Sequence, residues 1–267
     1  MKSTQGIKLA DVNALYAMWQ WRIFELMMGQ QLHVGGFRSS MELAELAGIA
    51  PGSRGVDLCC GSGASMRLLV RLRGIASMIG VEATDAVVGR GKSACERDGL
   101  AGSIRFVLAD ACFSGLPSGA ADFVWSEDAW CYVADKERLV AEAARIARPG
   151  GKIAFTDWVE GPVGLSDPEA ERLLRQMTFP NLQDIDGYRS LLEKQGCTVH
   201  RAEDTGRFAP CFDWYAQRVG TQLGYDALEI LNFDQERFRV LQGNLEFLGD
   251  LGRARKLVQA RFVASKN

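Results

Sequence analysis

The sequence is poor in the residues that metal sites and nucleic-acid interfaces use most. Only two histidines, His33 and His200, occur in 267 residues, and neither stands at a recognisable ligand spacing. We therefore expect no metal site. The formal net charge of -2 leaves no basic excess for a phosphate backbone, which disfavours a nucleic-acid partner. A small-molecule substrate is the expectation that remains.

Long apolar runs and paired cysteines are missing as well. No apolar stretch approaches 18 residues and no secretory signal is recognisable, so we expect a cytoplasmic protein with no membrane partner. The seven cysteines form no Cys-x-x-Cys pair, which is typical of reduced thiols in a core. No repeat or flexible linker divides the chain, so we predict one domain over 1–267, with a homodimer as an open alternative.

The most informative motif that the sequence does contain is a glycine turn. Residues 54–66 read Arg-Gly-Val-Asp-Leu-Cys-Cys-Gly-Ser-Gly-Ala-Ser-Met, and apolar residues then return at helical spacing up to Arg73. This pattern predicts a buried strand, a tight turn and a helix. Gly61 and Gly63 let the backbone approach a ligand, and the helix start offers free N–H groups. An ordinary strand-to-helix loop is the alternative.

Two common nucleotide motifs are absent from this turn. A dinucleotide fingerprint requires a third glycine or alanine where this chain has Met66. The Gly-Lys-Ser sequence that begins at Gly91 has Ala86 in place of the first glycine of a phosphate-binding loop. Both absences disfavour a dehydrogenase or an NTPase.

Three acids follow three successive predicted strands. Asp57 ends the first strand, Glu82 ends a strand over 76–81, and Asp110 follows a strand over 104–108. Open α/β sheets bind ligands at the carboxyl edge, and an acid about 20 residues after the glycine turn can reach both ribose hydroxyls. Each acid could instead cap the next helix.

The ordered motifs resemble those of class I S-adenosylmethionine-dependent methyltransferases over roughly residues 32–196. They are Val-Asp-Leu-Cys-Cys-Gly-Ser-Gly at 56–63, Gly-Val-Glu at 80–82, Leu-Ala-Asp-Ala at 108–111, Ala-Asp-Phe-Val-Trp at 121–125 and Ala-Arg-Pro-Gly-Gly-Lys-Ile at 147–153. The resemblance implies S-adenosyl-L-methionine as the cofactor, held by seven residues. They are Gly61, Gly63 and Asp57 at the methionine, Glu82 at the ribose, Asp110 and Ala111 at the adenine, and Ser126.

Within that class, residues 126–130 (Ser-Glu-Asp-Ala-Trp) resemble a stretch of the glycine, sarcosine and dimethylglycine N-methyltransferases. The resemblance implies an amine acceptor. Two departures leave the substrate open. Glu127 replaces a glutamine, and Cys131-Tyr132 stands where those enzymes usually carry leucine and histidine.

Alternating strands and helices predict an α/β fold with a doubly wound, seven-stranded, mostly parallel sheet. Further strands are expected at 121–126, 152–157, 197–204 and 257–264, with helices at 212–223, 226–231 and 235–248 inserted between the last two. We expect residues 1–50 to form a helical lid, 51–157 the cofactor-binding core, and 158–267 the substrate-covering insertions and final strands.

The first thirty residues carry an apolar stripe at helical spacing. Its members are Leu15, Met18, Trp19, Ile23, Phe24, Leu26 and Met27. We expect this segment to cover the cofactor, although plain core packing would give the same stripe. The turn at 33–36 could bring His33 and Tyr16 to the substrate, and a helix is expected from Ser39 or Ser40 to Ala47.

Methyl transfer needs placement and, for a protonated acceptor, a base. Glu127, His33 and Asp157 are the candidate catalytic residues, because clustered carboxylates raise one another's pKa and attract a cationic amine. The candidate substrate residues are Tyr16, Asp128, Trp130, Tyr132 and Trp158, whose aromatic members could form a box around a methylated ammonium. Each of them could instead serve the core or a turn.

Several functions stay open at this point. The leading one is methylation of an amine nitrogen on a small molecule. An oxygen, carbon or sulfur acceptor uses the same cofactor cradle, and a soft-metalloid methyltransferase would use Cys112, Cys131 and Cys211. A non-catalytic protein that binds S-adenosylmethionine is the alternative from another class.

Overall fold

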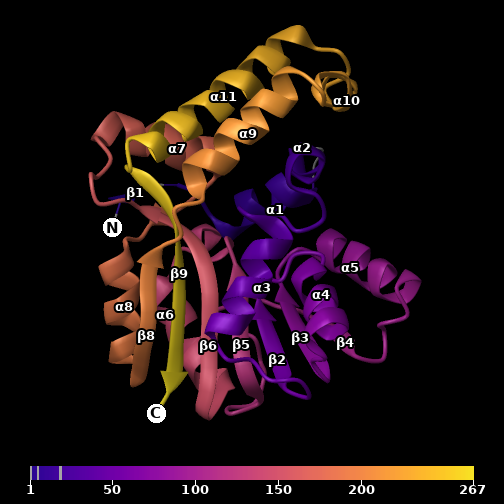
Figure 1. Ribbon diagram of the computed structural model, residues 1–267, viewed down its shortest axis with the longest axis vertical. Helices are drawn as coiled ribbons and strands as arrows, with labels where there is room; N and C mark the ends of the chain where they lie inside the picture. The colour runs from indigo at the N-terminus through magenta and orange to yellow at the C-terminus, as the bar shows by residue number, and fades with distance from the viewer. Residues whose placement is uncertain (1, 5, 18–19) are drawn as a thin grey trace.

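The computed structural model describes residues 2–4, 6–17 and 20–267 (Figure 1). Its central feature is a seven-stranded sheet in the order β4-β3-β2-β5-β6-β9-β8. The strands are β2 (Arg54–Leu58), β3 (Ser77–Glu82), β4 (Ile104–Leu108), β5 (Ala121–Glu127), β6 (Ala147–Glu160), β8 (Cys197–Asp204) and β9 (Leu257–Lys266). Only β9 runs antiparallel to its neighbours in this sheet. The predicted doubly wound, mostly parallel fold is confirmed.

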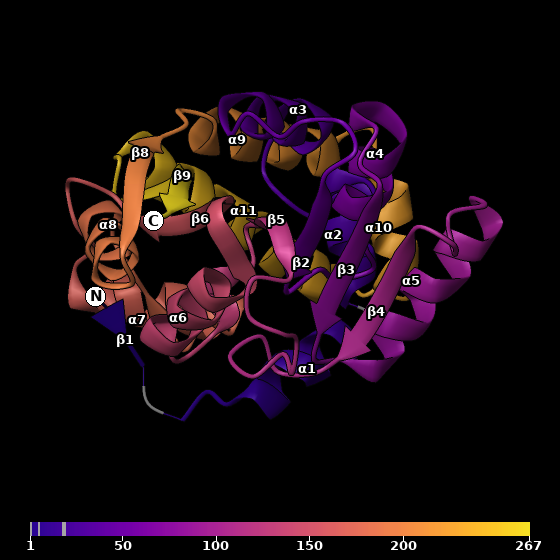
Figure 2. The ribbon, with the colours of Figure 1, turned by 90° about the horizontal axis from the view of Figure 1, so that it is seen from below.

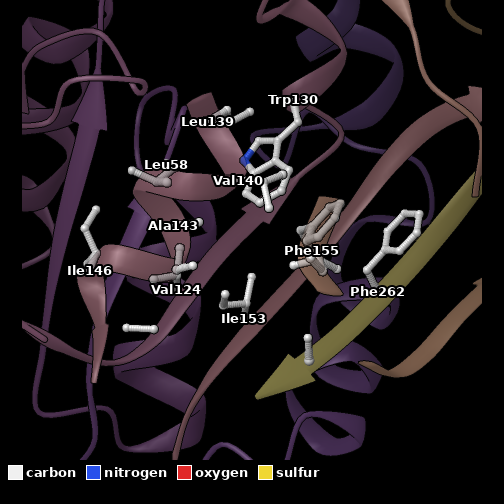
Figure 3. Close-up of a cluster of buried hydrophobic side chains, with 14 of the residues drawn as sticks. Leu58, Val124, Trp130, Leu139, Val140, Ala143, Ile146, Ile153, Phe155 and Phe262 are labelled. Atoms are coloured by element: carbon white, nitrogen blue, oxygen red, sulfur yellow. The ribbon is translucent and has the colours of Figure 1, made fainter. Parts of the chain in front are cut away.

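Helices cover both faces of the sheet (Figure 2). One face carries α3 (Gly36–Leu46), α4 (Ala64–Arg73) and α5 (Asp85–Arg97), and the other carries α6 (Lys136–Ile146) and α8 (Ile185–Lys194). Side chains of β5 alternate between the two cores, as strand geometry requires. Phe123 and Trp125 pack with α3 and α4, whereas Val124 packs against α6 in the cluster of Figure 3.

The remaining helices form a cap beyond the carboxyl edge of the parallel strands. They are α1 (Leu9–Ala17), α2 (Gln20–Met28), α7 (Asp167–Met177), α9 (Phe208–Gly220), α10 (Gly224–Ile230) and α11 (Gln235–Arg253). Ile23 and Met27 of the predicted stripe are buried in the core of this cap, while Met18 and Trp19 lie outside the described residues. A short ladder, β1 (Lys2–Ser3) with β7 (Asn181–Leu182), fastens the amino-terminal segment.

Several predicted element boundaries were wrong for physical reasons. The helix expected from Phe212 begins at Phe208, because Pro210 lies in the first turn, where a backbone N–H has no acceptor within the helix. The helix expected to end at Leu248 continues to Arg253. At Gly252 within this extension, an added Cβ would lie 2.9 Å from Phe208, so this glycine allows close helix packing rather than ending the helix.

Two glycines of α5 provide a matched test of packing beside the glycine turn. A Cβ on Gly91 would lie 2.6 Å from the Phe106 ring and 3.0 Å from the Ser62 carbonyl oxygen, whereas a Cβ on Gly89 would meet nothing within 4 Å. We expect Gly91→Ala to lower the free energy of unfolding by about 1–3 kcal/mol. Gly89→Ala should raise it by about 0.5–1 kcal/mol, because alanine favours a helix. Urea unfolding of both variants measures the difference, and equal stabilities would contradict the packing.

Candidate active site

A cavity of about 270 Å³ opens at the carboxyl ends of β2, β3 and β5. Figure 1 shows α1 across this edge of the sheet. The cavity wall includes residues of the glycine turn, three strand-end acids and the side chains of α1 that face the sheet. Its volume lies near the lower end of the ~300–1,000 Å³ range of small-molecule sites. The arrangement therefore combines a ligand-sized space with several convergent polar groups.

The glycine turn supplies backbone to the cavity wall. Gly61 adopts φ +54°, and a Cβ added to it would meet nothing within 4 Å, so a ligand can approach the bare backbone there. Gly63 lies behind the wall as the left-handed N-cap of α4, and its added Cβ would lie 2.7 Å from Met66. The structure thus separates the two predicted glycines into one that faces the cavity and one that shapes the turn.

Glu82 links the glycine turn to the end of β3. Its carboxylate accepts hydrogen bonds from the Gly61 N–H at 3.1 Å and the Thr84 N–H at 2.9 Å. Burial raises the pKa of this carboxyl, although both N–H groups favour its charged form. The Thr84 hydroxyl in turn donates to Asn13 Oδ1 at 3.0 Å, which fastens α1 over the cavity.

The other predicted cofactor acids also line the cavity. Asp57 is 3% exposed, and burial, followed by the charges of Glu127 and Glu82, raises the pKa of its carboxyl well above the usual value. Asp110 accepts a hydrogen bond from the Cys112 N–H at 2.8 Å, and Ala111 lies between these two residues in the wall. Bare backbone at Gly61 and carboxylates with lone pairs are groups that suit a nucleoside carrying a cationic amino acid. The chain's residues therefore fit S-adenosylmethionine.

Glu127 and His33 form a buried pair at the cavity wall. The His33 Nε2 lies 3.3 Å from Glu127 Oε2, and the two side chains are 3% and 2% exposed. The carboxylate also accepts hydrogen bonds from Ser65 at 2.6 Å, Ser40 at 2.9 Å and the Trp125 indole at 3.2 Å. Burial raises the pKa of Glu127, and the neighbouring His33 opposes that rise.

Among the described residues, the other ring nitrogen of His33 has no hydrogen-bond partner. Nδ1 is buried without a hydrogen bond, which ordinarily costs about 1–3 kcal/mol. Because Glu127 favours a proton on Nε2, we infer that Nδ1 carries a lone pair in the neutral ring. A ligand group with a proton to donate would satisfy it.

Asp128 has a structural environment that the strand-end pattern did not reveal. Its carboxylate accepts hydrogen bonds from the Val34 N–H at 2.7 Å, the Gln259 amide at 2.9 Å and the Trp158 indole at 3.2 Å. These donors hold the turn after His33 against β9 and β6. Asp128 lines the cavity, but its occupied oxygens make it a positioning residue for His33.

Tyr16 and Tyr132 meet above the reacting end of the cavity. Both line it, and their rings pack edge to face with centroids 5.4 Å apart. Burial raises the pKa of each phenol, so both are neutral hydroxyls at physiological pH. Both line the cavity, and their contact with a substrate stays a prediction.

Trp130 and Asp157 were predicted as site residues but lie away from the cavity, and both are corrected here. Trp130 is fully buried and stacks on Phe155 at 3.9 Å, so it belongs to the core in Figure 3. Asp157 is buried beneath it and accepts hydrogen bonds from the Cys131 N–H and the Tyr188 hydroxyl. Burial raises the pKa of Asp157 to about 6, but its carboxylate faces the core rather than a substrate.

Ser126 and Trp158 also differ from their predicted roles. The Ser126 hydroxyl donates to the Leu58 carbonyl at 2.8 Å and joins two strands, so it does not line the cavity. Trp158 borders a smaller cavity behind Tyr16 and donates to Asp128. No aromatic box with Trp130 and Trp158 therefore surrounds the main cavity.

Sequence reasoning missed two serines of the site. Ser65 follows the glycine turn directly and occupies the first turn of α4, which is a position that could have been recognised. Ser40 was expected near the start of a helix, but α3 begins at Gly36, and Ser40 reaches Glu127 from within it.

In the described ranges, no group of three or more His, Cys, Asp or Glu side chains could hold a metal ion. None of the helices described there is both long and apolar enough to cross a bilayer.

Comparisons with known proteins point to the same site. The family described as "Methyltransferase domain" matches residues 56–155, which contain the glycine turn and Glu127. Methyltransferase GfsG of Streptomyces halstedii is 28% identical over 171 residues, which cover 63% of this chain and 61% of that protein. The 2-methyl-6-phytyl-1,4-hydroquinone methyltransferase of Synechocystis sp. is 27% identical, over 73% of this chain and 68% of its own length.

A solved structure shares the whole fold. A candidate sarcosine dimethylglycine methyltransferase from Galdieria sulphuraria superposes with a TM-score of 0.81 at 22% identity, covering 96% of this chain and 98% of that one. Residues 56–155 therefore match a methyltransferase domain, and the chain as a whole shares the fold of a solved structure of that kind.

Proposed function

We propose that this chain transfers the methyl group of S-adenosylmethionine to an amine nitrogen of a small molecule. The observation that carries the proposal is the buried Glu127 and His33 pair, since His33 borders both the main cavity and the small one beside the cap, and its Nδ1 has no partner among the described residues. The similarity to a candidate sarcosine dimethylglycine methyltransferase supports an amine acceptor. The cofactor-binding residues are Asp57, Gly61, Glu82, Asp110 and Ala111.

The chain's own groups complete the proton balance of this reaction. When bound, S-adenosylmethionine supplies a methyl carbon whose bond to sulfur breaks, with its electron pair going to sulfur, as the nitrogen lone pair forms the new bond. A protonated acceptor must first lose one proton so that its nitrogen carries a lone pair. His33 Nδ1 accepts that proton and Glu127 stabilises the resulting imidazolium, while the methylated product leaves as an ammonium and loses its own proton to solvent.

The charge of the cavity wall favours a cationic or neutral acceptor. Six carboxylates line it, and Lys8 is the one lysine or arginine among the described residues of the wall. An acceptor that carries phosphate would normally meet arginine or lysine. The acidic wall therefore favours an amine over a phosphorylated substrate.

A hydroxyl acceptor is the second candidate. A neutral hydroxyl must lose its proton as the methyl group arrives, and Nδ1 of His33 can accept that proton equally well. The cavity wall excludes neither an amine nor a hydroxyl, because both groups are small and polar. An amine and an alcohol of the same shape, tested side by side, therefore distinguish the two candidates.

The test is methyl transfer from labelled S-adenosylmethionine to benzylamine and benzyl alcohol, after calorimetric titration with S-adenosylmethionine, S-adenosylhomocysteine and NAD. We expect both sulfur nucleosides to bind, NAD not to bind, and the amine to be methylated. Transfer to the alcohol alone would replace the nitrogen assignment with oxygen. Binding of NAD without either sulfur nucleoside would overturn the proposal as a whole.

A further inference from the structure

The helical cap forms a second, larger cavity of about 680 Å³ that is partly open to solvent. It lies between α2, α7, α9 and α11, and Figure 1 shows α2 beside the paired helices α9 and α11. Its walls are mainly hydrophobic side chains. They include Ile23, Phe24, Met27, Phe212, Leu245 and Leu248. Polar side chains border it chiefly near the start of α11, at Asp234 and Glu236.

This space and the main cavity are both bordered by side chains that also border a third, small cavity. A small cavity of about 20 Å³ lies between the two larger ones. Phe24 and Met177 border both the apolar cavity and the small one, whereas Tyr16, His33 and Tyr132 border both the small one and the main cavity. The same side chains that surround His33 are thus the first part of a route into the cap.

The size and lining of the cap cavity both call for an occupant. Large exposed apolar surfaces are uncommon on globular proteins and mark binding sites. A space of about 680 Å³ that is partly open to solvent and has mainly hydrophobic walls is such a surface. The main cavity, at about 270 Å³, leaves little room for a bulky acceptor once the cofactor lies at the glycine turn. A large acceptor must place most of its atoms elsewhere.

We propose that the cap cavity holds the apolar tail of the acceptor, so that the substrate class is an amphipathic molecule with a long hydrocarbon part. The polar end of the acceptor lies at His33, and the tail passes Phe24 and Met177 into the cap. Met177 is an unbranched, flexible side chain that can move aside for such a tail. The nitrogen at the polar end rests on the proposed function, whereas the tail site rests on the two cavities and their shared walls.

The direct test is methyl transfer to a series of straight-chain primary amines of two to twelve carbons. Burial of each added methylene should raise kcat/KM about three- to fourfold, until the chain reaches the end of the cavity. Over four methylenes this amounts to about 100-fold. A value of kcat/KM that does not depend on chain length would overturn the tail site.

A matched pair of tryptophan variants on α11 locates the effect. Leu241 borders the cap cavity, whereas Glu246 is exposed on the same helix and does not border it. We expect Leu241→Trp to fill part of the cavity and to shift the best chain length to shorter amines, while Glu246→Trp keeps the wild-type profile. An unchanged profile in folded Leu241→Trp would contradict the assignment. If that variant does not fold, the wild-type series still decides the question.

Calorimetry separates failure of the tail site from failure of the amine assignment. The enzyme saturated with S-adenosylhomocysteine is titrated with decanol, decylamine and ethylamine. Binding of both ten-carbon compounds without methyl transfer to any amine would support the tail site and overturn the nitrogen acceptor. Transfer to short amines, with no binding of decanol and no dependence on chain length, would overturn the tail site and leave the proposed function standing.

Discussion

Replacing His33 with alanine is expected to lower kcat for a protonated amine at least about 100-fold, while the affinity for S-adenosylmethionine stays close to that of the wild type. General-base catalysis contributes about 10²–10⁴-fold to rates, and His33 is the proposed base, a cavity residue whose Nδ1 is buried with no partner among the described residues. The measurement is steady-state turnover beside calorimetric titration with the cofactor. A variant that retains full turnover would remove His33 from catalysis.

The chain offers a natural control, because its other histidine lies far from the site. His200 is exposed on β8 and pairs with Ser265 at 2.8 Å, so His200→Ala should leave turnover unchanged.

Glu127→Gln tests the positioning role of the carboxylate, since the amide can no longer stabilise a protonated ring. It should shift the lower limb of the pH profile of kcat/KM as well as reduce kcat. Added imidazole should restore part of the activity of His33→Ala, which a purely structural loss would not allow.

The cofactor side of the site was predictable because its determinants are local. A strand, a glycine turn and a helix follow one another within about 20 residues, and parallel topology brings the ends of neighbouring strands to one edge. Asp57, Gly61, Glu82, Asp110 and Ala111 all line the cavity as that logic requires. Their presence there depends on strand order alone, and the confirmed sheet order supplies it.

For the corrected residues, the prediction was wrong about the direction in which each side chain points. Asp157 was expected at the mouth because it follows a strand-like run, but β6 continues to Glu160. Ile153, Phe155 and Asp157 occupy every second position of that strand and therefore lie on the same face. On that face the ring centroids of Phe155 and Tyr188 are 5.3 Å apart, and the Asp157 carboxylate accepts a hydrogen bond from the Tyr188 hydroxyl. The correct end of the strand would have placed Asp157 inside the sheet.

The cap could not be derived from one sequence for a different reason. Its cavity is bordered by residue 15 and by segments around residues 23–27, 176–177, 212 and 231–248, which meet only in the tertiary structure. Helical periodicity identified an apolar stripe on the amino-terminal segment, but an apolar stripe packs equally well against a neighbouring helix or a ligand. The distinction lies in the volume that the packed helices leave unfilled. That volume depends on helix positions that periodicity does not specify.

Replacing Glu82 with alanine is expected to weaken binding of S-adenosylmethionine by about 1.5–3 kcal/mol, or roughly 10- to 150-fold in the dissociation constant. The carboxylate accepts two N–H groups at 3.1 Å and 2.9 Å and still lines the cavity, so its remaining lone pairs can accept the two ribose hydroxyls. Calorimetric titration with S-adenosylmethionine and S-adenosylhomocysteine measures the loss.

A loss of affinity in Glu82→Ala must be distinguished from a collapsed glycine turn, because Glu82 also holds the Gly61 N–H. Glu82→Gln keeps the side-chain volume and one carbonyl oxygen, which can still accept one of the two N–H groups, and urea unfolding beside the wild type checks that it folds. We expect it to bind the cofactor about tenfold more weakly, since a neutral amide accepts fewer and weaker hydrogen bonds from the ribose. Glu96→Ala, at an exposed position on α5, should bind normally. Wild-type affinity in Glu82→Gln and Glu82→Ala alike would mean that the ribose is held by other groups, and that Glu82 serves only to connect β3 with the glycine turn.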